Sequence, residues 1–230
     1  MVTNFDNESL RAKYNPEGSQ LRRDQMELLR MLRVVTDICD AHGIQWWLSS
    51  GTRLGAARHE GFIPWDDDLD IAMLKSDYKR LKKILRNLDS KEYVLHDMES
   101  DVDYVNVFGK FRKRNGAIHS TSRRYNYYKW RGIGFDIFAV EKNSYLAARI
   151  ASVIYGNLQH ITSYIKWNWL RKPLIRLIEI LCLCIINPIL RLIGLINPCG
   201  EYHYSLGTGW AKTTIFLEDT FPLCLIHRAQ

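Results

Sequence analysis

One long amphipathic helix is predicted near the start of the chain. Between Ser19 and His42 the apolar residues recur at spacings of three, four and seven, which places them on one face of a helix. Gly43 follows directly and is typical of the position where a helix ends. The residues before this helix, 1–17, are mostly polar, and we expect them to form a loose arm.

Short apolar runs predict five strands in the next hundred residues. The expected strands are 44–50, 69–74, 93–98, 104–113 and 132–140. A helix is expected over 76–88, because Tyr78, Leu81 and Leu85 share one of its faces. Residues 51–64 contain several glycines and are predicted to be a connection.

The strand signals stop after Asn143, and residues 144–196 predict two or three helices. We therefore predict an α+β fold, in which a mixed sheet is flanked by helices and a helical region is appended. The predicted parts are an N-terminal arm at 1–18, a core at 19–141 and a helical region at 142–230.

Composition and charge narrow the class of protein. The chain of 230 residues is 47% apolar and 25% charged, which is typical of a folded protein and argues against disorder. The net charge of +7 indicates anionic partners. Five cysteines without a CxxC pair, and a polar N-terminus without a signal-peptide core, favour a reducing, cytosolic compartment.

Four aspartates are crowded into the stretch "GFIPWDDDLDI", residues 61–71. Side chains alternate along a strand, so Asp68 and Asp70 would project to the same side and repel each other unless a cation lies between them. Asp136, in "GFDIF", is a candidate third carboxylate on a neighbouring strand. Such a set suits a hard divalent ion, Mg²⁺ (or Mn²⁺), and three carboxylates can hold two such ions against a phosphate chain. The alternative is a solvated acidic turn.

A second set of residues is suited to phosphate. Ser50, Gly51 and Thr52 follow a predicted strand, and a small turn there lets backbone N–H groups approach a phosphate. Four cations are candidates for further contacts with it: Arg53, Arg58, Lys110 and Arg112. For each of them a surface ion pair or a solvated strand edge is the alternative. The aromatic and basic segment 122–131 is expected to form a loop over a donor or acceptor rather than to bind nucleic acid.

The block "GTRLGAARHEGFIPWDDDLDIAM" resembles the signature of the LicD-type phosphotransferases, a fukutin-related family of the nucleotidyltransferase-fold superfamily. The resemblance extends to Tyr78, to "KFR" at 110–112 and to "GFDIFAVE" at 134–141. It implies a nucleotidyltransferase-like catalytic core at 19–141. It also implies transfer of a substituted phosphate, such as phosphocholine or ribitol phosphate, from a CDP-linked donor to a hydroxyl of a surface glycan. Lipopolysaccharide, teichoic acid and capsule are the candidate acceptors.

By position, Gly51 and Thr52 match the family's donor-phosphate turn. Asp68 and Asp70 match its metal-binding pair, and Asp136 its third carboxylate. The family usually continues beyond "FLEDTFP" into elements that this sequence does not contain, which suggests a shortened C-terminus. Two alternatives therefore stay open: a glycosyltransferase whose D-x-D pair binds a sugar nucleotide, and an inactive, truncated member of the family.

The most apolar part of the chain, residues 174–196, predicts an amphipathic helix with a narrow polar stripe. The charges within it make it a poor membrane-spanning helix. Packing on the core and peripheral membrane contact through 166–196 are both open. The second alternative would place the protein at the inner face of the cell membrane, beside a glycolipid acceptor.

Overall fold

The computed structural model describes residues 7–117, 123–165, 168–196 and 202–204. The helices are α1 (Asn7–Tyr14), α2 (Gln20–Ala41), α3 (Ser50–His59), α4 (Lys75–Arg86), a short 3₁₀ turn (Arg123–Asn126), α5 (Tyr145–Tyr164), α6 (Asn168–Leu181) and α7 (Asn187–Ile196). A π-helical turn, Cys182–Ile186, joins α6 to α7. The strands are β1 (Trp47–Leu48), β2 (Asp70–Leu74), β3 (Tyr93–His96), β4 (Gly109–Lys113), β5 (Gly134–Lys142) and β6 (Tyr202–Tyr204).

The strands form one mixed sheet in the order β1-β2-β5-β4-β3, and β6 pairs with the end of β5. The pair β2–β5 is parallel, whereas the other pairs are antiparallel. The predicted α+β class, with a mixed sheet flanked by helices, is confirmed. The central strand is β5, the last long strand among the described residues.

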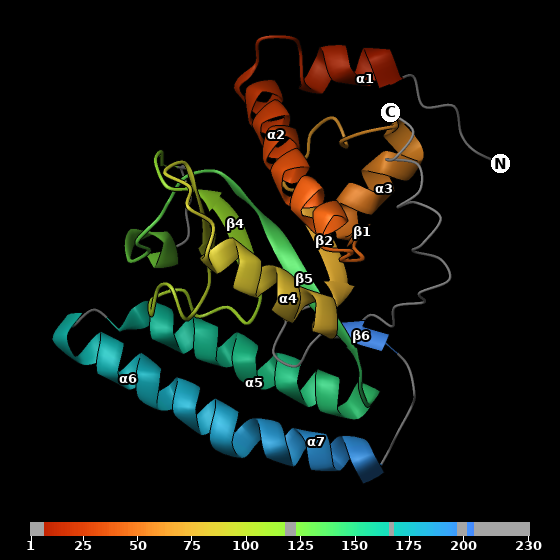
Figure 1. The fold of residues 1–230 in the computed structure, drawn as a ribbon. Coiled ribbons are helices and arrows are strands. Elements are labelled where there is room, and N and C mark those ends of the chain that lie inside the picture. The colour runs from red at the N-terminus through yellow and green to blue at the C-terminus, as the bar shows by residue number, and fades with distance from the viewer. Residues whose placement is uncertain (1–6, 118–122, 166–167, 197–201, 205–230) are drawn as a thin grey trace.

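The main hydrophobic core lies between one face of this sheet and the helices α2 and α4 (Figure 1). Leu28, Met31 and Val35 of α2 pack there against Ile71 and Ile137. Ser19 begins α2, since its hydroxyl accepts a hydrogen bond from the Arg22 N–H at 3.1 Å. This packing buries one face of the sheet. The opposite face carries a smaller apolar cluster, which includes Ala72, Phe138 and Val140, and polar residues beside it.

The predicted connection at 51–64 is wrong, because residues 50–59 form helix α3. The glycines of this segment serve close packing rather than a turn. A side chain at Gly55 would lie 2.5 Å from the Gly61 carbonyl oxygen, so only glycine allows α3 to approach the following loop.

Three further expectations need correction. The arm is not loose over 7–14, which form α1; the Arg11 guanidinium donates to the His59 carbonyl at 3.2 Å and ties α1 to α3. The strand expected over 104–113 begins only at Gly109, since the Tyr104 N–H donates to the Asp101 carbonyl in a turn. The region 142–230 is not purely helical, because β6 lies within it.

The predicted helices after residue 144 are confirmed as α5, α6 and α7. In Figure 1, α6 and α7 run antiparallel to α5 and form the outermost layer of the molecule. Pro188 has no N–H to donate to the preceding turn, which accounts for the wider π-helical turn just before it.

Candidate functional site

A row of polar side chains crosses the sheet on the face opposite the main core. The parallel register sets Asp70 of β2 beside Asp136 of β5, and the antiparallel register sets Asp136 beside Lys110 of β4. Residues paired in register project to the same face of a sheet. The structure therefore brings together two of the three predicted metal-binding carboxylates and one of the predicted donor-binding cations.

Lys110 and Asp136 form an ion pair of 2.9 Å between Nζ and Oδ1. Both side chains are largely buried, with exposed fractions of 13% and 20%. Burial alone would lower the pKa of Lys110, but the Asp136 carboxylate outweighs it and the pKa is raised. The ammonium of Lys110 is thus held charged beside the carboxylates.

The carboxylates carry more negative charge than this one ammonium offsets. Burial, with the charges of Asp136 and Asp68, raises the pKa of Asp70 to about 7. Loss of part of its hydration beside the sheet also raises the pKa of Asp68, although its side chain still reaches solvent; Lys110 opposes the rise, and Asp67 and Asp136 add to it. Asp68 is exposed and lies two residues before Asp70, just ahead of β2. A donor set of carboxylate oxygens with excess negative charge fits a hard divalent cation.

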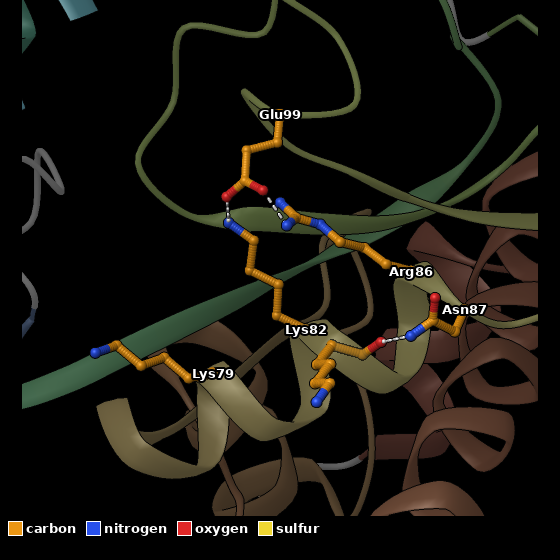
Figure 2. Close-up of a pocket in the computed structure, with 6 residues that line it drawn as sticks. Lys79, Lys82, Arg86, Asn87 and Glu99 are labelled. Atoms are coloured by element: carbon orange, nitrogen blue, oxygen red, sulfur yellow. Dashed lines mark hydrogen bonds and ion pairs between the residues drawn. The ribbon is translucent and has the colours of Figure 1, made fainter. Parts of the chain in front are cut away.

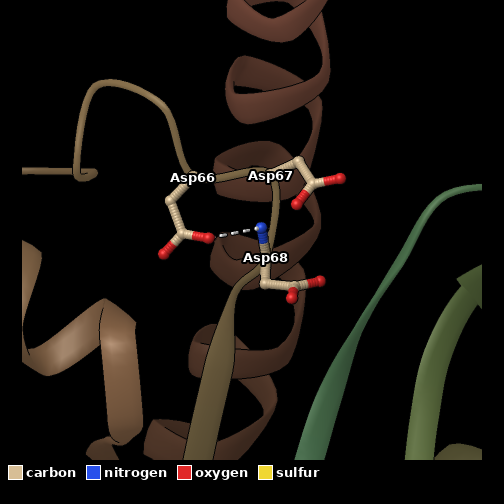
Figure 3. A group of neighbouring side chains, drawn as sticks. All are labelled: Asp66, Asp67 and Asp68. Carbon is tan, nitrogen blue, oxygen red and sulfur yellow. Dashed lines mark hydrogen bonds between the residues drawn. The ribbon is translucent and has the colours of Figure 1, made fainter.

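The turn before β2 brings three carboxylates together, as Figure 3 shows for Asp66, Asp67 and Asp68. Their oxygens lie within 4.8 Å of one another, but Asp66 points away from the other two. The Asp66 carboxylate accepts the Asp68 N–H at 3.4 Å and so shapes the turn. A side chain at Gly51 would come within 2.9 Å of Asp66 Oδ2, which places this carboxylate at the first turn of α3.

Helix α3 begins beside this row. The Asp70 N–H donates to Thr52 Oγ1 at 2.8 Å, and the Ser49 N–H donates to the Asp70 carbonyl at 2.9 Å. A hydrogen bond from Ser50 stabilises the Asp70 carboxylate and counteracts the rise of its pKa. Ser50 has a φ of 49°, an unusual conformation for a residue other than glycine. Ser50, Gly51 and Thr52 thus form the first turn of a helix whose N–H groups suit a phosphate.

The predicted donor-binding arginines lie apart from one another. Arg53 is half-buried in the first turn of α3, whereas Arg58 is exposed in its last turn, about 7.5 Å further along the helix axis at 1.5 Å per residue. Arg112 is fully buried; its Nη1 donates to the Gly132 carbonyl at 2.7 Å, and its guanidinium lies 5.6 Å from the Tyr125 ring centre. Contact of these arginines with a donor stays a prediction.

Residues 43–155 match the family model described as "LicD/FKTN/FKRP, nucleotidyltransferase domain". This segment is a domain of the LicD family. The matched segment runs from β1 into α5 and contains every predicted site residue of this LicD domain.

The LicD domain also resembles individual curated proteins. It is 43% identical over 60 residues to the lipopolysaccharide cholinephosphotransferase LicD of Haemophilus influenzae, which covers 26% of this chain and 23% of that protein. It is 44% identical over 45 residues to the human ribitol 5-phosphate transferase FKRP, covering 20% of this chain and 9% of FKRP. An uncharacterized protein of Rickettsia prowazekii is 36% identical over 83 residues, or 36% of this chain and 30% of that protein. The chain thus aligns with less than a third of the length of each of these relatives.

One positioning residue, which lies before the matched segment, was not predicted from the sequence. Gln25 of α2 is buried, and its amide donates to the Asp66 carbonyl at 2.8 Å. The Asn15 amide in turn donates to Gln25 Oε1 at 2.6 Å. These bonds fix the aspartate turn to α2. The signal for Gln25 was a polar residue on the apolar face of a predicted helix, four positions after Leu21 and three before Leu28.

The segment expected to lie over a donor or acceptor packs inward over its described part, 123–131. Tyr128 is buried beside His96, and the Lys129 N–H donates to the Asp101 carboxylate at 2.8 Å. The Tyr127 ring lies 3.8 Å from the Arg171 guanidinium. These contacts join the LicD domain to α6.

A depression of about 360 Å³ lies on α4, away from the carboxylate row (Figure 2). It is lined by Lys79, Lys82, Lys83, Arg86, Asn87 and Glu99. Lys82 and Arg86 form ion pairs with both Asp97 and Glu99, so much of its positive charge is neutralised within the protein. None of the predicted site residues of the LicD domain lines this depression.

His96 ends the polar row and makes stability depend on pH. It is fully buried, with Nε2 at 2.8 Å from the Asp101 carboxylate, and burial lowers its pKa below the ordinary 6.5. Protonation of His96 therefore favours the unfolded chain, and this contribution to stability is lost as the pH falls below 6.5. We expect the free energy of unfolding of His96→Gln, measured in urea, to vary less between about pH 7 and 5 than that of the wild type. Equal slopes for both proteins would contradict this role.

Proposed function

We propose that the protein transfers a substituted phosphate, such as phosphocholine or a polyol phosphate, from a CDP-activated donor to a hydroxyl of a cell-surface glycan. The observation that carries the proposal is the row Asp70–Asp136–Lys110 at the first turn of α3. Carboxylates for a metal ion, an ammonium and free helical N–H groups are thereby gathered where a pyrophosphate could bind. The named activities of the relatives LicD and FKRP support this choice of reaction.

Asp68 and Asp70 would hold Mg²⁺ (or Mn²⁺), which, when bound, supplies charge neutralisation for the pyrophosphate of the donor. Asp136 would either share a metal ion or act as the base toward the acceptor hydroxyl, and the step below takes it as the base. The first turn of α3 binds a donor phosphate through the N–H groups of Gly51 and Thr52.

In the proposed reaction the acceptor oxygen attacks the phosphorus in line, the bond to CMP breaks, and CMP leaves with the electron pair. The proton of the acceptor hydroxyl passes to Asp136 Oδ2, while Oδ1 stays paired with Lys110. We place this reaction in the cytoplasm at the inner face of the cell membrane, where a nucleotide donor meets a lipid-linked glycan.

Donor binding tests the proposal. Calorimetric titration with CDP-choline, CDP-ribitol and a UDP-sugar, each with and without Mg²⁺, is expected to detect Mg²⁺-dependent binding of a CDP-linked donor. Binding of the UDP-sugar alone would favour a glycosyltransferase. A folded protein that binds none of them would overturn the proposal in favour of an inactive family member.

Lys110→Met tests the role of the ammonium. Because the positive charge of Lys110 repels a metal ion at Asp136, we expect the variant to bind Mn²⁺ more tightly, by roughly threefold to tenfold, in a calorimetric titration. We also expect slower release of CMP from the donor, because one countercharge to the phosphates is lost. Lys79→Met, an exposed lysine of α4, is the matched control and should change neither quantity. Weaker Mn²⁺ binding by Lys110→Met would rule out this competition.

A further inference from the structure

The outward side of the continuous helix α6–α7 is apolar along most of its length. We call this surface the outer face; it consists of Leu177, Ile180, Leu181, Cys184, Ile185, Ile189, Leu192, Leu195 and Ile196, all exposed. Its last two residues are 75% and 85% exposed. The spacing of three and four residues keeps these side chains on one side of the helix. A stripe of this length without a charge is unusual for a surface that meets only water.

Polar residues of this helix bond to α5 or to one another. Tyr155 of α5 donates to Asn187 Oδ1 at 2.8 Å, and Glu179 is paired with Arg176 at 2.6 Å. The side of the helix opposite the outer face buries Ile175, Cys182 and Leu190. The helix is therefore apolar on two sides, one packed on α5 and one exposed.

Helix α5 adds a second exposed apolar row. Leu146, Val153, Ile161 and Tyr164 recur at spacings of seven, eight and three and are each exposed by more than 40%. Since α6–α7 runs antiparallel beside α5 in the outermost layer (Figure 1), apolar surface is exposed on both helices of this hairpin.

By length and composition the helix Trp169–Ile196 could cross a membrane, with 28 residues and a mean hydropathy of 2.1 in its most apolar window. Its contacts argue against that orientation. Arg171, 2% exposed, binds the Asp103 carboxylate at 2.6 Å and the Thr162 carbonyl at 2.6 Å, which holds the start of the helix against the water-exposed LicD domain. A helix that packs along one side on such a domain cannot be surrounded by lipid.

The charged and aromatic residues around the outer face match a lipid surface. Trp169, 78% exposed, and Lys172 lie at one end, and the exposed Arg191 lies near the other. Aromatic rings and cations at the margin of an apolar stripe are typical of helices that lie at headgroup level. The net charge of +7 favours an anionic surface.

We propose that the outer face of α6–α7 docks in the plane of a bilayer that contains anionic lipids. The apolar side chains enter the acyl boundary, and Lys172 and Arg191 contact the headgroups. This binding does not depend on the proposed function, because it requires neither donor nor acceptor.

Vesicle co-sedimentation of the full chain tests this inference. We expect the protein to bind vesicles of phosphatidylcholine and phosphatidylglycerol more tightly than vesicles of phosphatidylcholine alone. Ile185→Glu and Leu192→Glu should each weaken this binding about tenfold or more, because each places a charge at the acyl boundary. Met26→Glu, the same kind of change at an exposed apolar residue of α2, is the matched control and should bind like the wild type.

The exposed Cys184 reports the depth of the outer face. An environment-sensitive fluorophore on Cys184, with Cys199 and Cys224 replaced by serine, should shift to shorter wavelength on addition of the anionic vesicles.

Three outcomes would overturn the proposal. The first is no binding to either kind of vesicle. The second is resistance of the bound protein to alkaline carbonate extraction, which indicates a spanning helix. The third is a dimer in sedimentation that Leu192→Glu dissociates, together with no change in the fluorescence of the Cys184 probe when vesicles are added. Donor binding is measured separately without lipid, so failure here leaves the proposed function intact.

Discussion

Asp70→Asn is expected to lower the release of CMP from a CDP-linked donor by about 10³-fold or more, with the fold intact. Asparagine keeps the size of the side chain and the N–H bond to Thr52, but it removes a charged metal ligand from the centre of the row. The same change relieves repulsion among Asp68, Asp70 and Asp136, so the metal-free variant should melt a few degrees above the wild type. Lower activity with higher thermal stability is the combination that marks a functional carboxylate.

Asp67→Asn is the matched control. Asp67 belongs to the same aspartate turn but has no partner in the register of the row. We expect its activity to stay within about threefold of the wild type, since Asp67 is exposed to solvent, where water and salt screen its charge. Wild-type activity in Asp70→Asn, or equal losses in both variants, would contradict the assignment of Asp70.

Arg171→Met is expected to have the largest effect on stability. Its guanidinium lies under the Tyr127 ring, binds Asp103 and also donates to the Thr162 carbonyl, all in a buried position. Methionine retains the length and apolar contacts but leaves the Asp103 carboxylate buried and unpaired. The expected cost is about 3–5 kcal/mol in the free energy of unfolding, measured in urea by circular dichroism.

Two comparisons separate charge from packing. Arg176→Met removes a partly exposed ion pair with Glu179, three residues along the same helix, and should cost less than about 1 kcal/mol, because the arginine side chain is 43% exposed. Arg171→Met combined with Asp103→Asn should recover part of the loss, because the unpaired charge is then removed. A loss for Arg171→Met no greater than that for Arg176→Met would mean that this buried pair does not hold the helices.

The elements with clear periodicity were predictable. Helix α2, helix α4 and the strands β2 and β5 follow directly from apolar spacing. Helix α3 was not, because its glycines indicate a turn locally, whereas Gly55 is required by contact with a loop that folds back on it. A glycine that is required by tertiary packing does not change the spacing of apolar residues around it, so the sequence pattern does not reveal the helix.

The sequence was sufficient to predict which residues belong to the site, but not which of them lie next to one another in space. The sequence shows that Asp70 and Asp136 each lie between apolar residues, but only the parallel register sets them side by side. Lys110 was expected to face phosphates, and the register instead gives it Asp136 as a partner. Register depends on which strands become neighbours, and that is decided by the whole sheet. The metal and donor roles of these residues remain predictions.

The position of β5 has a consequence for synthesis on the ribosome. This strand is made after β1 to β4, yet it lies between β2 and β4 and supplies Asp136, which stands between Asp70 and Lys110 in the row. A nascent chain that ends before residue 134 therefore has β2 and β4 with unpaired edges and lacks Asp136, one of the three carboxylates of the site. The exposed edges of β2 and β4 are the surfaces of this intermediate that a chaperone would bind. The site would then form in a single late step, when β5 is inserted between them.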